Sequence, residues 1–345
     1  MTRLWNRRRR LFTGHGAAMK LRSPLAPSPA RVPRRTPSAS ARFWVLSFLL
    51  TGILAAQPKV GALKVQGNVY LIYGAGSNIT MQAGDQAVVL VDSGPASMTE
   101  EVRRAIRTVS SRPISLIIST AFDRDHTSGN GALAKGGFYM FASPNETRPE
   151  AAKVSHLRVL ERMSAENSGI PEADWPGDTY DDPDWKLYAN DEPLILEHPL
   201  AAHSDGDTIV FFRRSDVISM GDIFDSDHYP VIDAKNGGSL AGILKTINHV
   251  LKDIAIPKAN EEGGTYIIPG HGRVCDRTDL TKYRDMLSVI RDRIQDLVSK
   301  GATLDQVKKA RPTFDYDGGY GADSGPWTTD KFVEAVYREL GGKAK

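Results

Sequence analysis

The feature that most constrains this chain is a polar stretch that directly follows an apolar segment. Residues 114–118, Ile-Ser-Leu-Ile-Ile, have the composition of a buried strand. The stretch that follows, residues 119–130, contains two carboxylates and an imidazole in close succession: Asp123, Asp125 and His126. A hard or borderline cation needs oxygen and nitrogen ligands of this kind, which are deprotonated or easily made so. The stretch therefore predicts a metal site at the end of a strand.

Further polar groups lie at the ends of other expected strands. They are Asp92-Ser-Gly94, His203-Ser-Asp-Gly-Asp207, Gly221-Asp222 and Pro269-Gly-His271-Gly272. Taken alone, each is typical of an ordinary turn or cap. An α/β scaffold can bring strand ends from distant parts of a chain together. The set therefore indicates one site assembled from all of these segments.

In order and spacing, these landmarks resemble the metallo-β-lactamase superfamily over residues 64 to about 275. The family pattern in the polar loop is His-x-His-x-Asp-His, and Ala121 and Asp123 occupy its first two histidine positions. The resemblance implies an α/β (four-layer α+β) fold, the αββα sandwich, with metals at one edge of its two sheets. We expect this domain over residues 57–280, with a C-terminal helical extension, residues 281–345, packed on the same domain.

The resemblance also implies a set of metal ligands. Asp125, His126 and His271 match the second metal position, and Asp222 matches the carboxylate that can bridge two metals. At the first metal position His203 is the one remaining histidine, with Asp123 as an oxygen ligand beside it. The prediction is one Zn²⁺ ion held by Asp125, His126, His271 and Asp222, and the carboxylates also suit iron or manganese.

A site with a single metal is sufficient for hydrolysis. Bound zinc lowers the pKa of its water to about 7. Asp125 or Asp123 would hold or deprotonate that water, and a neutral His203, free of metal, would act as general base or hold the oxyanion. We expect a metal-dependent hydrolase that acts on an ester, lactone, thioester or amide bond of a small molecule.

Two other functions remain open. Loss of two family histidines favours a catalytically inactive member of the superfamily that binds a ligand or acts as a scaffold. β-Lactamase activity is a third function, because a fold does not fix its substrate.

The hydrophobic pattern predicts alternating sets of strands and helices. Strands are expected over residues 64–73, 78–82, 87–92, 114–118, 138–142, 194–200, 208–212, 216–220 and 265–268. Helices are expected over residues 97–109 (with a capping box at Ser97), 150–167, 239–254, 279–298 and 329–340, with a short one after Thr303. Residues 171–185 are expected to form a long loop.

The first 56 residues differ from the rest of the chain. They carry eleven Lys and Arg and no acidic residue, and they end in the apolar run 43–56. This pattern predicts a signal peptide at about residues 20–56, hence a periplasmic or secreted protein, or a membrane anchor if the segment is not cleaved. The remaining residues carry 33 basic and 41 acidic side chains, a balance that does not favour nucleic-acid binding.

Two residues near the motifs are assigned different roles. Cys275, the only cysteine, is expected to be a small buried residue and not a nucleophile. Tyr229 follows Asp222 by seven positions, and it either donates a hydrogen bond to a substrate carbonyl or packs as an aromatic residue beside Pro230. The sequence does not indicate an oligomeric state.

Overall fold

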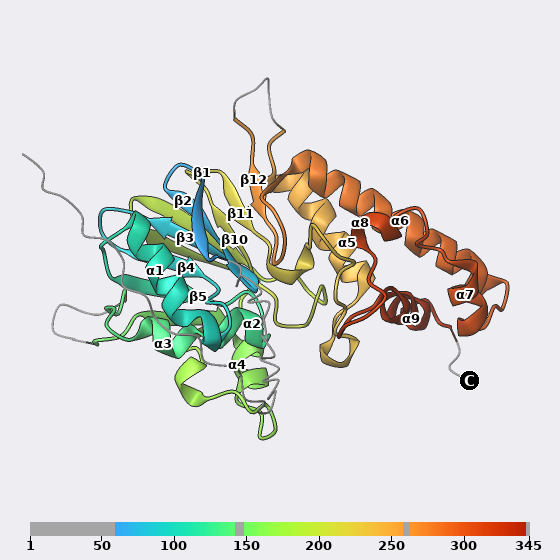
Figure 1. Cartoon of the computed structure of the whole chain (residues 1–345), viewed down its shortest axis with the longest axis horizontal. Helices are drawn as coiled ribbons and strands as arrows, with labels where there is room; N and C mark the ends of the chain where they lie inside the picture. Colours follow the sequence, from blue (N-terminus) through green and yellow to red (C-terminus); the bar gives the residue numbers. More distant parts are fainter. Residues whose placement is uncertain (1–58, 142–147, 258–262, 343–345) are drawn as a thin grey trace, which may run out of the picture. The chain divides into compact units, whose positions relative to one another are not determined.

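Two β-sheets pack face to face in the part of the chain that the structure, a computed structural model, describes: residues 59–141, 148–257 and 263–342 (Figure 1). The first sheet has the order β1 (Gly61–Gln66), β2 (Val69–Ala75), β3 (Ser77–Ala83), β4 (Val88–Val91), β5 (Ile114–Ile118), β6 (Ala152–His156) and β7 (Asp178–Tyr180). Neighbours from β1 to β4 are antiparallel, whereas β4 to β7 run parallel. The parallel part therefore ends its strands at one edge.

The second sheet has the order β13 (Cys275–Asp276), β12 (Tyr266–Ile268), β11 (Val217–Ser219), β10 (Ile209–Phe212), β9 (Glu192–Glu197) and β8 (Asp184–Ala189). Its strands β11 and β12 are parallel, and the other neighbours are antiparallel. The C-terminal ends of β11 and β12 lead directly into Asp222 and His271.

The alternation of side chains along each strand explains the layered core. In β4, Val89 and Val91 face the other sheet, and Val88 and Leu90 face outward. The outward residues are covered by α1 (Thr99–Val109) and α3 (Asn130–Ala134). Because both faces of β4 are buried, its sequence is continuously apolar rather than alternating.

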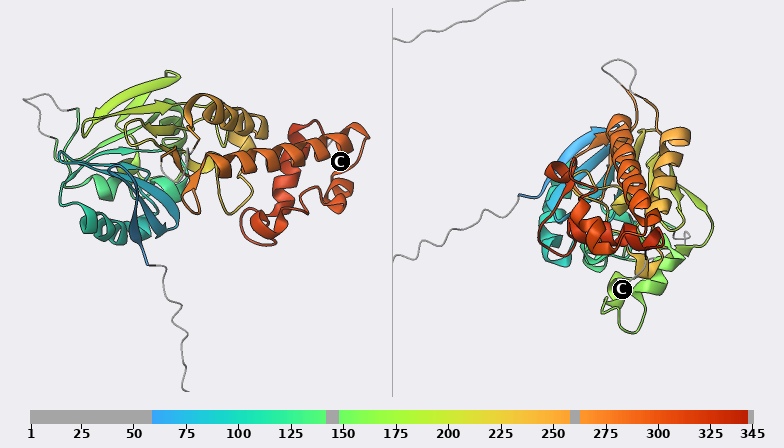
Figure 2. Two further views of the ribbon diagram at one scale, coloured as in Figure 1. Left: turned by 90° about the horizontal axis from the view of Figure 1, so that it is seen from above. Right: turned by 90° about the vertical axis from the view of Figure 1, so that its right-hand side faces the viewer.

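The outer face of the second sheet is covered by other helices. They are α5 (Leu240–His249) and α6 (Arg277–Ser299), and α9 (Thr329–Glu339) packs in turn on α6. The apolar side chains of α5 and α6 share a buried cluster with residues such as Ile218 and Met220 of the second sheet and its end. Figure 2 shows the long helix α6 leading away from the sheets toward α7 (Leu304–Ala310) and α9. The predicted αββα sandwich is confirmed.

The C-terminal helices share their core with the second sheet. Tyr283 and Leu287 of α6 and Phe332 of α9 belong to the same buried cluster as Phe224, which follows β11. Helix α6 begins at Arg277, so it crosses the predicted domain boundary between residues 280 and 281.

Four expectations about regular structure are wrong in part. Residues 64–73 form a hairpin of β1 and β2, because Gly67 turns the chain with a φ of 56°. Residues 150–167 contain β6 followed by the short helix α4 (Leu157–Met163), because the segment around Val154 pairs in parallel with both β5 and β7. Residues 138–141 form no strand, and the loop expected at 171–185 contains β7 and the start of β8.

The capping of the helices was predicted with mixed success. At α7, the short helix expected after Thr303, the Thr303 and Gln306 side chains form a capping box. At α1 the N-cap is Met98 and no side chain caps the helix, so the capping box expected at Ser97 is wrong.

The predicted signal peptide or anchor over residues 1–56 lies outside the described residues. Within residues 59–141, 148–257 and 263–342, no helix is long and apolar enough to cross a membrane.

Candidate metal centre

Asp92 and His126 form the buried base of the candidate site. Asp92 follows β4 with a φ of 66°, and its carboxylate accepts hydrogen bonds from the Thr120 backbone N–H at 2.8 Å and from Thr120 Oγ1 at 2.7 Å. His126 lies in the short helix α2 (Arg124–Thr127), and its Nδ1 lies 2.8 Å from Asp92 Oδ2. Because Nδ1 carries the proton in this bond, neutral His126 presents an Nε2 lone pair.

The atom that His126 presents has no hydrogen-bond partner among the described residues. Its Nε2 is buried, and so is Asp222 Oδ1, which lies 3.1 Å away. With His126 neutral, both atoms are acceptors and cannot bond each other, so a proton on Nε2 or a cation has to lie between them. Buried polar atoms without a hydrogen bond are rare and costly, so each such atom needs an explanation. A cation that both atoms contact would supply one.

His271 completes the group on the side of the second sheet. Its Nε2 lies 3.3 Å from Asp125 Oδ2 and 3.5 Å from Asp222 Oδ1. The approach of Asp222 depends on Gly270, where a Cβ atom would lie 2.1 Å from Asp222 Oδ1 and 2.8 Å from the carbonyl carbon of Gly221. Asp125, His126 and His271 thus have ligand atoms within 4.8 Å of one another, as the sequence predicted them to be grouped.

Asp123, His203 and Asp222 form a second group with ligand atoms within 4.8 Å of one another. Two members of this group already pair with each other: His203 Nε2 lies within hydrogen-bond distance, 3.0 Å, of Asp123 Oδ2. His203 Nδ1 lies 2.9 Å from the carbonyl oxygen of Val231. Ala121, buried beside β5, offers no ligand atom.

The charged side chains of the two groups shift one another's pKa values. Burial opposes protonation of His126, yet the carboxylates of Asp222 and Asp92 raise its pKa well above the usual value. Burial likewise opposes protonation of His271, and Asp125 and Asp222 raise its pKa. Burial would raise the pKa of Asp222, but the three imidazoles around it, that of His126 foremost, lower it. The carboxylates therefore remain ionised and attract positive charge, which protons or a metal ion can supply.

His203 differs from the neutral base expected for it. Its Nδ1 donates to the Val231 carbonyl, so a hydrogen bond from Nε2 to the Asp123 carboxylate requires a second proton on the ring. Burial opposes that proton, but the hydrogen bond and charge of Asp123 raise the pKa of His203 well above the usual value. In this arrangement His203 is an imidazolium.

The donor set fits a divalent cation. It combines imidazole nitrogens and carboxylate oxygens, which suit zinc and also iron or manganese. The two buried atoms without a hydrogen bond, His126 Nε2 and Asp222 Oδ1, belong to this set. Cys275, a soft ligand, is not part of it: this residue lies in β13, and burial raises the pKa of its thiol to about 12.

The structure also shows the positions of Tyr229 and Asp92, two residues from the sequence motifs. Tyr229 is packed in the interior: its hydroxyl donates to the Thr313 carbonyl oxygen at 3.2 Å and its ring stacks on Phe332. This is the packing role, not contact with a substrate. Asp92 was recognised only as part of a motif, and the position of an acidic residue at the end of a strand was the signal for its contact with His126.

Comparison with known proteins agrees with this geometry. A family model described as the metallo-beta-lactamase superfamily matches residues 64–271. The solved structure of the stereoselective inverting sec-alkylsulfatase Pisa1 from Pseudomonas sp. is similar with a TM-score of 0.60 and 16% identity, over 82% of this chain and 50% of that one. This chain thus spans about half the length of that enzyme. No curated protein matches the chain.

Metallo-β-lactamases themselves are also similar. The enzyme from Pontibacter korlensis has a TM-score of 0.51 and 16% identity, over 66% of this chain and 99% of that one. The DIM-1 enzyme has a TM-score of 0.50 and 18% identity, over 67% and 98%. At these identities the likeness to solved structures shows a shared fold.

Proposed function

The chain belongs to the metallo-β-lactamase superfamily, and from this premise we propose that it is a metal-dependent hydrolase with a single resident metal ion. The observation that carries the proposal is the pair of buried atoms without hydrogen bonds, His126 Nε2 and Asp222 Oδ1, 3.1 Å apart. Either a metal ion or a proton on His126 Nε2 would pair these two atoms, and the metal analysis described below separates the two.

The hydrogen bonds favour the group around His126 as the metal position. Asp125, His126, His271 and Asp222 would hold the ion, which is most simply zinc, with iron or manganese as alternatives. In the other group, a metal ion would have to break the 3.0 Å hydrogen bond between His203 and Asp123. In the first group His126 keeps its hydrogen bond to Asp92, and the contact that a metal ion would replace, between His271 Nε2 and Asp125 Oδ2, is longer at 3.3 Å.

When bound, the ion would supply a Lewis acid that polarises the substrate and lowers the pKa of a bound water to about 7. Asp125, half-exposed beside the group, would orient the attacking water through its carboxylate. The protonated Nε2 of His203 would donate a hydrogen bond to the oxyanion or a proton to the leaving group. Asp123 would keep that proton on His203 Nε2 until it is needed.

The substrate is proposed as a small molecule with an ester, lactone, thioester or amide bond. The sulfatase named above adds the sulfate ester to the bonds worth testing, and the lactamases add the β-lactam. In the ester, lactone, thioester and amide substrates, water attacks the carbonyl carbon, the bond from that carbon to the leaving alcohol, thiol or amine breaks, and the leaving group takes up a proton. We propose an exported location, since residues 1–56 have the pattern of a signal peptide.

Metal analysis of the purified protein tests the proposal. We expect about one equivalent of zinc, iron or manganese per chain, as in single-metal sites. His271→Ala should lose this metal, and His249→Ala, which changes a surface histidine paired with Glu197, should keep it. Absence of metal even after reconstitution would refute the proposal of a metal-dependent hydrolase. Two equivalents of metal per chain would refute the proposal that the site holds a single ion.

A substrate screen of wild type and His271→Ala then tests turnover. The panel comprises a lactone, a thioester, a phosphodiester, a β-lactam and a secondary alkyl sulfate. We expect one of these to be hydrolysed by the wild type and not by His271→Ala. A fully metal-loaded wild type that hydrolyses none of them would favour the inactive, ligand-binding member of the superfamily.

A further inference from the structure

A cavity of about 780 Å³ lies between the end of β6, the end of β9 and helix α5. His156, His198 and Thr246 are among the residues that line it. Its size falls within the range of sites for small molecules. The candidate metal ligands are not among its lining residues, although Ala201 and Asp205 bring its wall close to the loop that carries His203.

The cavity is built around two stacked imidazoles. The rings of His156 and His198 have centroids 3.5 Å apart and planes inclined by 7°. His156 Nδ1 accepts a hydrogen bond from the Arg158 backbone N–H at 3.3 Å. His198 Nδ1 lies 2.8 Å from the carbonyl oxygen of Asp207, so it is the donor there. The backbone therefore fixes a different tautomer on each ring.

These tautomers leave one donor and one acceptor on the two stacked rings. In the neutral rings, His156 keeps an Nε2–H group and His198 keeps an Nε2 lone pair. Both rings are neutral at neutral pH: burial first, and then the neighbouring His198, lowers the pKa of His156 to about 4. Burial also lowers the pKa of His198. Among the described residues, neither Nε2 has a hydrogen-bond partner; Asp181 Oδ1 is 3.9 Å from that of His156.

The stack argues against a metal ion shared by the two rings. A metal ion lies near the plane of each imidazole that binds it, at about 2.0–2.1 Å for zinc. An ion shared by two parallel rings 3.5 Å apart would lie far outside both planes. Consistently, the groups of potential metal ligands found among the described residues are the two at the sheet edge.

The charged residues around the cavity do not favour an ionic occupant. Most of them are paired: Glu197 with His249, Arg158 with Glu161, Asp184 with Lys186, and Asp205 with Arg162. The remaining two, Lys245 and Asp181, have opposite charges and are exposed to water. Exposed charges of this kind contribute little to binding.

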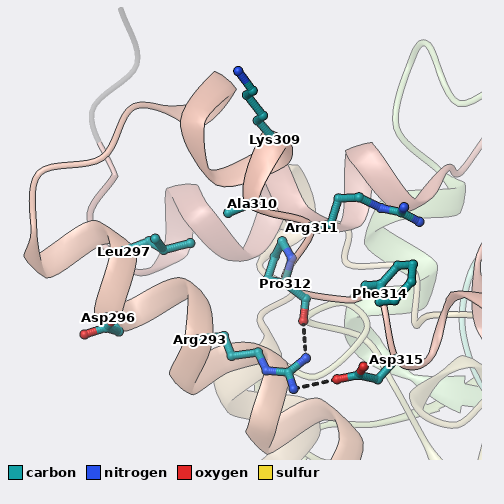
Figure 3. Close-up of a pocket in the computed structure, with 9 residues that line it drawn as sticks. All are labelled: Arg293, Asp296, Leu297, Lys309, Ala310, Arg311, Pro312, Phe314 and Asp315. Carbon is teal, nitrogen blue, oxygen red and sulfur yellow. Dashed lines mark hydrogen bonds and ion pairs between the residues drawn. The ribbon is translucent and has the colours of Figure 1, made fainter.

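In the pocket between α6 and α7, most of the polar groups are already paired with one another. Figure 3 shows Arg293 bonded to Asp315 and to the carbonyl oxygen of Pro312. Arg311 pairs with Asp317 and lies over the ring of Phe314. The principal polar groups of this pocket therefore bind one another and are not available to select a ligand.

We propose that the cavity at His156 and His198 binds a neutral amphipathic alcohol. Its hydroxyl oxygen accepts the N–H of His156, its hydroxyl hydrogen is donated to His198 Nε2, and its apolar body lies on Pro183, Pro199, Leu200 and Ile209. A hydroxyl is both donor and acceptor. A carboxylate would satisfy only His156, and an ammonium only His198.

Calorimetric titration of the purified protein with 1-octanol, octanoate and octylamine tests this proposal, because the three probes share a chain and differ in the head group. We expect octanol to bind at one site and the other two to bind at least about tenfold more weakly, since each leaves a polar group unpaired. This comparison uses the wild type, so it does not depend on the folding of a variant or on hydrolytic activity.

Variants locate the site. His156→Phe and His198→Phe keep a flat ring and remove the nitrogens, and each should weaken octanol binding about tenfold. Lys245→Ala should change it less than about twofold. Tightest binding of octanoate with loss in Lys245→Ala, tightest binding of octylamine with loss in Asp181→Asn, or no binding of octanol by the wild type would each overturn the proposal.

Discussion

The carboxylate of Asp92 lies 2.8 Å from Nδ1 of His126 and thereby directs the other ring nitrogen toward Asp222. Asp92 itself is fixed by two hydrogen bonds from Thr120, the second residue after β5. The ends of two neighbouring parallel strands thus set the orientation of one candidate ligand. Carboxylates that orient a metal-binding histidine in this way contribute to its affinity.

Asp92→Asn should therefore weaken metal binding without removing a ligand. The amide keeps the size of the side chain but can present an N–H to His126, which would favour the wrong tautomer. We expect about 10- to 100-fold weaker metal affinity, measured by competition with a chelator. Asp85→Asn, at an exposed position before β4, is the matched control and should bind as the wild type does. Equal affinities in both variants would contradict the role of Asp92.

Asp123→Asn distinguishes a proton-holding residue from a metal ligand. Without the carboxylate at 3.0 Å, His203 should lose its proton near neutral pH, and turnover should fall about 10²- to 10⁴-fold. Metal content should remain at one equivalent, as measured by elemental analysis. Loss of metal along with turnover would show instead that Asp123 is a ligand.

Gly270→Ala should disturb the approach of β12 to Asp222. The added methyl would lie 2.1 Å from Asp222 Oδ1 and 2.8 Å from the Gly221 carbonyl carbon, so the loop must move. We expect a loss of about 1–3 kcal/mol in the free energy of unfolding, measured in urea, together with weaker metal binding. Gly177→Ala meets no atom within 4 Å and is the control. Similar unfolding curves for the two variants would contradict the close approach.

Local sequence signals were sufficient to predict the layers of the sandwich and the grouping of Asp125, His126 and His271. Strands such as β4 and β5 are continuous apolar runs, and the polar motifs stand directly at their ends. A motif at the end of a strand stays next to that strand regardless of the conformation of the loops. For this reason the residues of the candidate site could be named before their distances were known.

Pairings between distant residues could not be predicted in the same way. The segment around Val154 fits a helical pattern, and its parallel pairing with β5 and β7 decides that it is a strand. The stack of His156 on His198 joins residues far apart in the sequence, and no motif marks it. The protonated state of His203 likewise depends on its tertiary contact with Asp123.

The low pKa of His156 predicts a contribution to the pH dependence of stability. Its pKa is about 4 in the folded protein against 6.5 as the ordinary value, so between these pH values the unfolded chain binds more protons than the folded one. The contribution of His156 to the free energy of unfolding is therefore fully present above about pH 6.5 and is lost as the pH falls toward 4. The shift corresponds to at most about 3 kcal/mol.

His156→Asn should remove this dependence while preserving the start of α4. His156 caps that helix by accepting from the Arg158 N–H, and asparagine can accept the same bond without titrating. We expect the free energy of unfolding, measured in urea from pH 7 to pH 4, to fall less steeply in the variant than in the wild type. Metal release and the other histidines affect both proteins, so the difference between the two curves isolates His156. Parallel curves would mean that its pKa is not lowered by the fold.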